Sequence, residues 1–87
     1  MYSVYILYSQ NADRYYIGHT GDSLKERLRK HNGNHAGFTG RFSDWMIVYS
    51  EDYPDKASAY RRERELKGWK DRHRLTRLIR SVSEHPG

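Results

Sequence analysis

Cysteine is absent from this chain of 87 residues, which excludes disulfide bridges and thiolate zinc sites and agrees with a reducing cytoplasm. No stretch is long and apolar enough to cross a membrane, and no N-terminal signal pattern is present. Internal repeats and low-complexity linkers are lacking as well. We therefore expect a single cytoplasmic domain over residues 1–81, followed by a frayed tail over residues 82–87.

Apolar residues are few, at 36% of the chain, so the core must be small and built largely from aromatic side chains. Acids are outnumbered, 11 against 16 Lys and Arg, which leaves a net charge of +5. The basic residues fall in two blocks, 1–43 and 60–87, on either side of an acidic stretch, 44–59. This pattern favours an anionic partner such as nucleic acid, although a solvated basic surface has the same composition.

Two strand-like runs open the chain, residues 2–8 and 15–19, and both are rich in aromatic and β-branched side chains. The six polar residues between them, 9–14, predict a turn, so the two runs are expected to pair as an antiparallel hairpin. The hairpin would bring Tyr5 and Tyr16 close in space. Two phenols on paired strands serve either sheet packing or chemistry, and the hairpin alone does not distinguish these.

A helix is predicted over residues 23–32, because Ser23 and Glu26 fit a capping box and a glycine-containing turn follows. Arg27 and His31 lie four residues apart, beside the apolar stripe that meets the sheet. An arginine with a buried stem and a hydrogen-bonded histidine would be the structural explanation. Phosphate chemistry is the functional one.

The remaining elements alternate between polar connections and apolar segments. We expect a polar loop at 33–44, a strand at 45–49 and a charged turn at 51–56. A helix should follow from 55 or 56 to about Lys67, where Gly68 breaks or kinks it, and a last helix at about 71–81. The resulting order, strand-strand-helix-strand-helix-helix, is an α+β domain.

Glu63 is out of place in the second predicted helix. It lies four residues after Ala59 and three before Leu66, inside the inward-facing stripe. A carboxylate there costs free energy unless it is paired or binds a metal ion. An ion pair with Arg27 or Arg62 is one explanation, and a metal site is the other.

The chain resembles the GIY-YIG nuclease family, and within it the small stand-alone bacterial branch. Ser3-Val4-Tyr5 stands where the first motif falls, and Tyr16-Ile17-Gly18 reproduces the second. The segments 27–31 and 62–69 resemble that branch as well. The similarity spans roughly residues 2–79. Two departures are Ser3 in place of the first glycine and the lack of any asparagine after Asn34.

The resemblance implies a three-stranded antiparallel sheet flanked by helices and metal-dependent hydrolysis of DNA. By motif, Tyr5 and Tyr16 match the two motif tyrosines, Arg27 and His31 match the arginine and histidine of the first helix, and Glu63 matches the metal-binding glutamate. Glu65 is a rival for Glu63, but the stripe favours Glu63. A single carboxylate suits Mg²⁺, for which Mn²⁺ can substitute.

In such a site Arg27 would clamp the phosphate and Tyr16 would be the general base. Alternatively, Tyr16 or His31 passes the proton through water while Tyr5 orients the nucleophile. Further basic side chains would contact the nucleic-acid backbone without reading its sequence: Lys25, Arg29, Lys30, His35 and Arg41, together with the C-terminal arginines.

The leading hypothesis is thus a Mg²⁺- or Mn²⁺-dependent endonuclease acting on DNA in repair or recombination. A catalytically silent nucleic-acid-binding module is the alternative, and a basic assembly protein with an acidic partner is a third reading. The preferred substrate structure and the oligomeric state stay open.

Overall fold

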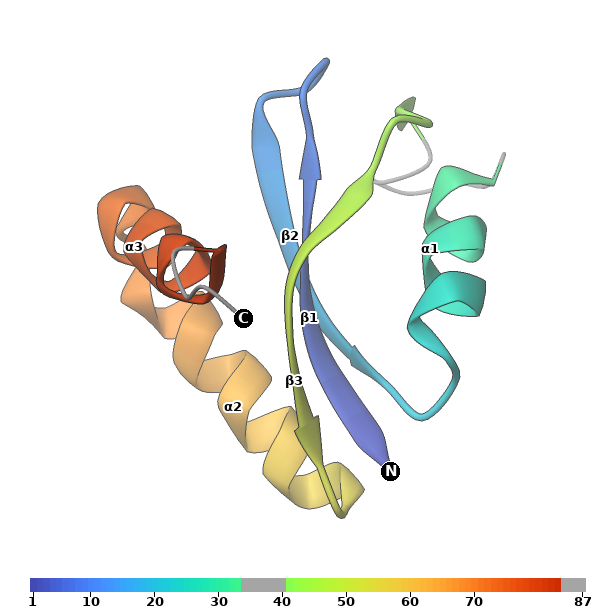
Figure 1. Ribbon diagram of the computed structural model, residues 1–87, viewed down its shortest axis with the longest axis vertical. Coiled ribbons are helices and arrows are strands. Elements are labelled where there is room, and N and C mark those ends of the chain that lie inside the picture. Colours follow the sequence, from blue (N-terminus) through green and yellow to red (C-terminus); the bar gives the residue numbers. More distant parts are fainter. Residues whose placement is uncertain (34–40, 84–87) are drawn as a thin grey trace.

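A computed structural model describes residues 1–33 and 41–83 of the chain (Figure 1). The elements follow the expected order of the α+β domain: β1 (Tyr2–Ser9), β2 (Arg14–Thr20), α1 (Leu24–Asn32), β3 (Met46–Tyr53), α2 (Lys56–Trp69) and α3 (Arg72–Ser83). Within the described ranges, no helix has the length and apolarity that a membrane span requires.

The three strands form one antiparallel sheet in the order β2-β1-β3, so β1 is central and β2 is an edge strand. The expected hairpin forms, with Tyr5 opposite Gly18 and Leu7 opposite Tyr16. A central strand is covered on both faces, which explains why β1 is an almost continuous apolar run. Its pairing with β3 shifts register between Ile6 and Leu7.

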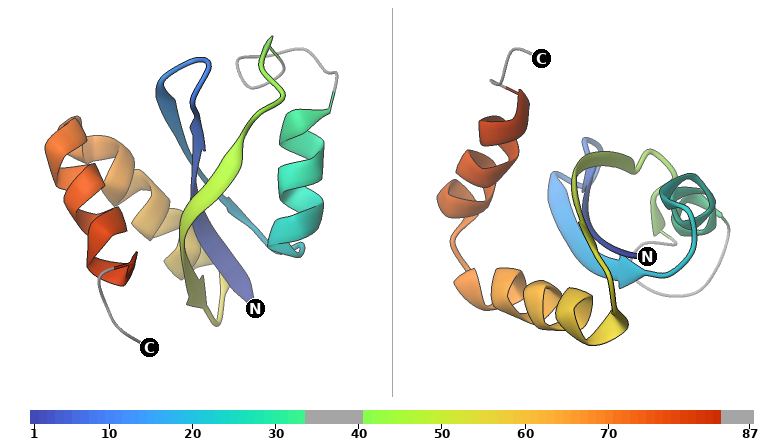
Figure 2. Two further views of the ribbon diagram at one scale, coloured as in Figure 1. Left: turned by 45° about the horizontal axis from the view of Figure 1, so that its top comes forward. Right: turned by 60° about the horizontal axis from the view of Figure 1, so that its bottom comes forward.

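Helices cover both faces of the sheet, with α1 on one side and α2 and α3 on the other (Figures 1 and 2). Alternate residues of β1 therefore enter two separate cores. Val4 and Ile6 pack with the buried residues of α2 and α3, whereas Tyr5 and Leu7 pack with Trp45 and the apolar side of α1. This division decides on which face each functional side chain emerges.

The start of α1 follows the prediction in part. Ser23 is the N-cap, and its hydroxyl accepts a hydrogen bond from the backbone N–H of Glu26 at 3.1 Å. The Glu26 carboxylate does not complete a capping box, because it binds the guanidinium of Arg29 instead. The cap thus relies on the serine alone.

Two predicted boundaries are wrong. The third strand continues through Tyr53, because its charged half still pairs with β1; Ser3, for example, donates to Asp52 at 2.7 Å. Gly68 does not break the second helix, which continues to Trp69 and ends where Lys70 adopts a left-handed backbone with φ of 51°. The last helix reaches Ser83, and residues 84–87 lie outside the described ranges.

Candidate active site

Tyr5 is the centre of a buried polar cluster between β1 and α1. Its side chain is 1% exposed. The phenol oxygen accepts a hydrogen bond from Nε of Arg27 at 3.1 Å and lies 2.9 Å from Nε2 of His31. Because Arg27 can only donate, the phenol proton is available for the histidine, which favours the His31 tautomer with an unprotonated Nε2. Residues from two elements thus hold one another in place.

The phenol of Tyr5 stays neutral in this setting. Burial raises the pKa of Tyr5, and the neighbouring Arg27 offsets this rise only in part. The negative charge of Glu63 also contributes to the higher pKa. Tyr5 is therefore suited to positioning Arg27 and His31, and not to accepting a proton.

Gly18 makes room for this arrangement. A Cβ atom at Gly18 would lie 2.6 Å from the Tyr5 hydroxyl oxygen and 2.8 Å from the adjacent ring carbon. Such distances are far below van der Waals contact, so any other residue here would displace the phenol. The glycine is thus required by close packing against the strand partner, not by an unusual backbone angle.

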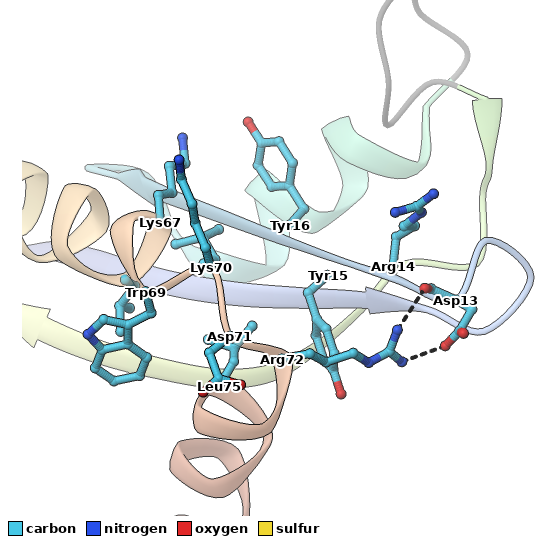
Figure 3. Close-up of a pocket in the computed structure, with 12 residues that line it drawn as sticks. Asp13, Arg14, Tyr15, Tyr16, Lys67, Trp69, Lys70, Asp71, Arg72 and Leu75 are labelled. Carbon is cyan, nitrogen blue, oxygen red and sulfur yellow. Dashed lines mark hydrogen bonds and ion pairs between the residues drawn. The ribbon is translucent and has the colours of Figure 1, made fainter.

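Tyr16 lies beside the cluster without joining its hydrogen bonds. Its ring centroid is 4.8 Å from that of His31 and 6.5 Å from that of Tyr5. Within residues 1–33 and 41–83, its hydroxyl has no hydrogen-bond partner, and it points away from the sheet (Figure 3). Unlike Tyr5, Tyr16 has a hydroxyl that is available to a substrate or a water molecule.

Arg27 keeps donors that its contact with Tyr5 does not use. Only Nε is used by Tyr5, and the two terminal nitrogens have no partner among the described residues. The pKa of Arg27 is raised, mainly by the hydrogen bond to Tyr5, so the guanidinium is always charged. A guanidinium fixed at Nε with open terminal nitrogens is suited to bidentate binding of a phosphate.

Glu63 is buried in α2 and fully paired. Its Oε1 lies 2.5 Å from Nδ1 of His19, and its Oε2 accepts from Nζ of Lys67 at 2.6 Å. Burial by itself would raise the pKa of Glu63, but the hydrogen bonds from Lys67 and His19 outweigh it and lower the pKa. The predicted pairing with Arg27 or Arg62 is wrong, because Arg62 binds Glu51 and Glu65 instead.

The structure thus brings four of the five predicted residues into one cluster, and the fifth approaches from the other side. Tyr5 and Tyr16 face α1, whereas His19 pairs with Val4 and faces α2. Tyr16 and His19 lie three residues apart, about 10 Å along the edge strand β2. Gly18, which has no side chain, lies between Tyr16 and His19 in this edge strand.

The residues around Glu63 fit a cation. The ammonium group of Lys67 already occupies the cation position at Oε2, and that side chain is 51% exposed and can move aside. His19 holds the other oxygen and would orient the carboxylate. No group of three or more His, Cys, Asp or Glu side chains that could hold a metal ion occurs in the described part of the chain. The carboxylate of Glu63 is thus the group that would hold a divalent ion, one that keeps several waters and needs few protein ligands.

The side chains that are predicted to contact the nucleic-acid backbone differ in their exposure and in their ion pairs. Lys25 and Arg41 are exposed. Arg29 is also exposed but pairs with Glu26 at 2.5 Å, and Lys30 lies 3.4 Å from Asp22, so neighbouring acids offset both charges. His35 lies outside the described residues.

His19 and Lys67 hold the Glu63 carboxylate, although neither is among the residues predicted for the site. Lys67 could have been found, since it lies four residues after Glu63, the spacing of a helical ion pair. His19 could not, because its contact with Glu63 joins residues 44 positions apart. Finding it requires knowing that α2 covers the face of β2 on which His19 emerges.

One of three comparisons with known proteins gives a match. Residues 1–76 match the family model described as GIY-YIG catalytic domain, which is most of the chain. Neither the curated proteins nor the solved structures gave a match. Members of the family generally depend on a divalent metal ion. The chain belongs to the GIY-YIG family of catalytic domains and is an endonuclease, a hydrolase that cleaves the phosphodiester bonds of nucleic acid.

Proposed function

We propose that the protein hydrolyses phosphodiester bonds in DNA with the help of Mg²⁺ or Mn²⁺, and that it acts in repair or recombination. The observation that carries the proposal is that the fold holds two complementary charged groups in fixed positions, one on each face of the sheet. Arg27 is fixed by Tyr5 with its terminal nitrogens available, and Glu63 is held as a charged carboxylate by His19 and Lys67.

Arg27 binds the scissile phosphate in this proposal. Its two terminal nitrogens donate to non-bridging oxygens, and its charge offsets the negative charge that builds up in the transition state. Tyr5 keeps the guanidinium plane in position through Nε. A divalent ion bound at Glu63 supplies a Lewis acid for the phosphate oxygens.

In its phenolate form, Tyr16 takes the proton of the attacking water and becomes the neutral phenol; it is assigned this role because its hydroxyl is the available one of the two motif tyrosines. Arg27 attracts an ionised Tyr16, and this attraction contributes to the raised pKa of Arg27 after the hydrogen bond to Tyr5. The water oxygen forms a bond to phosphorus while the opposite phosphorus–oxygen bond breaks. The leaving sugar oxygen takes a proton from solvent.

A cleavage screen tests the proposal directly. Branched, nicked, single-stranded and damaged DNA, and RNA, are incubated with Mg²⁺ or Mn²⁺ and the full chain. We expect metal-dependent nicking that disappears in Glu63→Ala and in Glu63→Gln, because both lose the charged carboxylate.

Glu65→Gln is the matched control, since Glu65 lies in the same helix, carries the same charge and is exposed. It should cleave like the unmodified protein. Salt-sensitive binding without cleavage of any substrate would contradict the proposal and would favour a silent nucleic-acid-binding module. Cleavage that survives Glu63→Gln but is lost in Glu65→Gln would show that Glu65, and not Glu63, holds the metal ion.

A further inference from the structure

A groove of about 560 Å³ lies beside the site, between β2 and the junction of α2 with α3 (Figure 3). Tyr16 forms part of its lining, so it adjoins the available hydroxyl described above. Leu66, which is buried, and the partly buried Ile17 also line it. The groove therefore has an apolar part beside the edge strand β2.

Its lining is rich in positive charge. Arg14, Lys67 and Lys70 extend from the groove on the same side as the Tyr16 hydroxyl (Figure 3). Arg14 and Lys70 have no ion-pair partner in the described ranges, and both are exposed. Two positive side chains that share the groove with Tyr16 are thus not held in ion pairs.

The acids of the groove are already occupied. Asp13 pairs with Arg72 at 2.6 Å, which joins the hairpin turn to the start of α3. Asp71 accepts hydrogen bonds from the backbone N–H groups of His73 and Arg74, as a helix cap does. Arg14 is near enough to Asp13 to help lower the pKa of that carboxyl, after the larger effects of Arg72 and Tyr8, but it forms no ion pair with Asp13. Lys70 pairs with neither acid, so the groove keeps positive charge on the side of Tyr16.

Lys70 adds an independent observation. Its φ of 51° lies in the left-handed region, at the C-cap of α2, where glycine is the usual residue. A lysine backbone is strained in this region. Because the Lys70 side chain is exposed, no burial of that side chain offsets the strain. A strained residue that presents a charge next to a site points to a functional contact.

We propose that this groove binds the sugar–phosphate backbone of the nucleic-acid strand that flanks the scissile phosphate, through Arg14 and Lys70. The inference rests on the proposed function, because it takes the strand to be cut beside Tyr16. Backbone phosphates would be the ion-pair partners that these two side chains do not have among the described residues. The opposite side of the molecule is less suited, since acids offset Arg29 and Lys30 of α1.

The test measures binding of a short fluorescent single-stranded oligodeoxynucleotide in EDTA, so that no cleavage is needed. We compare Arg14→Gln and Lys70→Gly with Arg61→Gln, which removes the same charge from another flank of α2, where Arg61 lines a separate hollow. For single strands, each lost phosphate contact lowers the slope of log affinity against log salt by about 0.7, or roughly fivefold in affinity at about 0.1 M salt.

We expect this loss in Arg14→Gln and in Lys70→Gly, and no comparable loss in Arg61→Gln. Lys70→Gly should also melt no lower than the unmodified protein, because glycine relieves the strained φ, so weaker binding cannot come from unfolding. Equal losses of affinity in all three variants would show that only the net charge of the protein matters, and would overturn the proposal. Unchanged binding in Arg14→Gln and Lys70→Gly would also overturn it.

The two proposals fail separately. If the oligonucleotide binds through Arg14 and Lys70 but nothing is cleaved with Mg²⁺ or Mn²⁺, the groove stands and the catalytic proposal fails. If cleavage depends on Glu63 but substitution of Arg14 and Lys70 leaves binding unchanged, the catalytic proposal stands and the groove proposal fails.

Discussion

The two motif tyrosines should separate stability from catalysis. Tyr5→Phe removes a hydroxyl that accepts from Arg27 and lies within hydrogen-bond distance of His31, at a position that is 1% exposed. Tyr16→Phe removes a hydroxyl that has no hydrogen-bond partner in the described part of the chain. The same chemical change is therefore made in two different environments, one strand apart.

The expected magnitudes differ accordingly. A hydrogen bond to a charged group contributes about 1.5–3 kcal/mol and a neutral one about 1 kcal/mol, so Tyr5→Phe should cost about 3 kcal/mol. A domain of this size has roughly 4–13 kcal/mol of stability, so the variant should still fold, with a melting temperature lower by about 15 °C. Tyr16→Phe should change stability by less than about 0.5 kcal/mol.

Cleavage should show the reverse order. Tyr16→Phe loses the proton acceptor and should cleave at least about a hundredfold more slowly. Tyr5→Phe misplaces Arg27 and should lose up to about a hundredfold, measured at a temperature where it is folded. Urea denaturation and single-turnover nicking give both quantities. Equal destabilisation by the two substitutions, or full activity of Tyr16→Phe, would refute the division of roles.

Three further predictions concern the fold. Gly68→Ala should raise stability by about 0.5–1 kcal/mol in thermal melts, because glycine is a poor helix former and a Cβ atom there meets nothing within 4 Å; a lower melting temperature would contradict this. Gly18→Ala should cost about 1–3 kcal/mol and slow cleavage, since its Cβ would overlap Tyr5; a neutral effect would mean that the phenol is displaced easily. Burial would raise the pKa of Glu51, but the two bonds from Arg62, each 3.0 Å, outweigh it and lower the pKa. Its contribution to stability is therefore present above about pH 4.3 and lost as pH falls through the lower folded pKa, so Glu51→Gln should reduce the loss of stability between neutral pH and about pH 3, as followed by urea denaturation.

Local features of the chain were predictable wherever one physical effect dominated. The aromatic and β-branched runs at 2–8 and 15–19 could bury their side chains only as strands, and the turn between them allowed one pairing. Ser23 begins α1 as its N-cap, because its hydroxyl accepts a hydrogen bond from the backbone N–H of Glu26. The family was predictable from the motifs, and the match over residues 1–76 confirms it.

Element ends were less predictable where partners from elsewhere in the chain decided them. The charged half of β3 reads as a turn by composition, yet its pairing with β1 keeps it extended to Tyr53. Gly68 reads as a helix breaker, yet its neighbours hold it in α2, and the break falls at Lys70.

For the site, spacing along the chain already indicates which residues are out of place in a simple core: Arg27, His31 and Glu63. Local spacing is enough for that, because a charged or titratable side chain beside an apolar stripe costs free energy wherever the stripe packs. Their partners depend on the tertiary structure, because the sheet separates two faces. Arg27 and His31 meet Tyr5 on one face, and Glu63 meets His19 on the other.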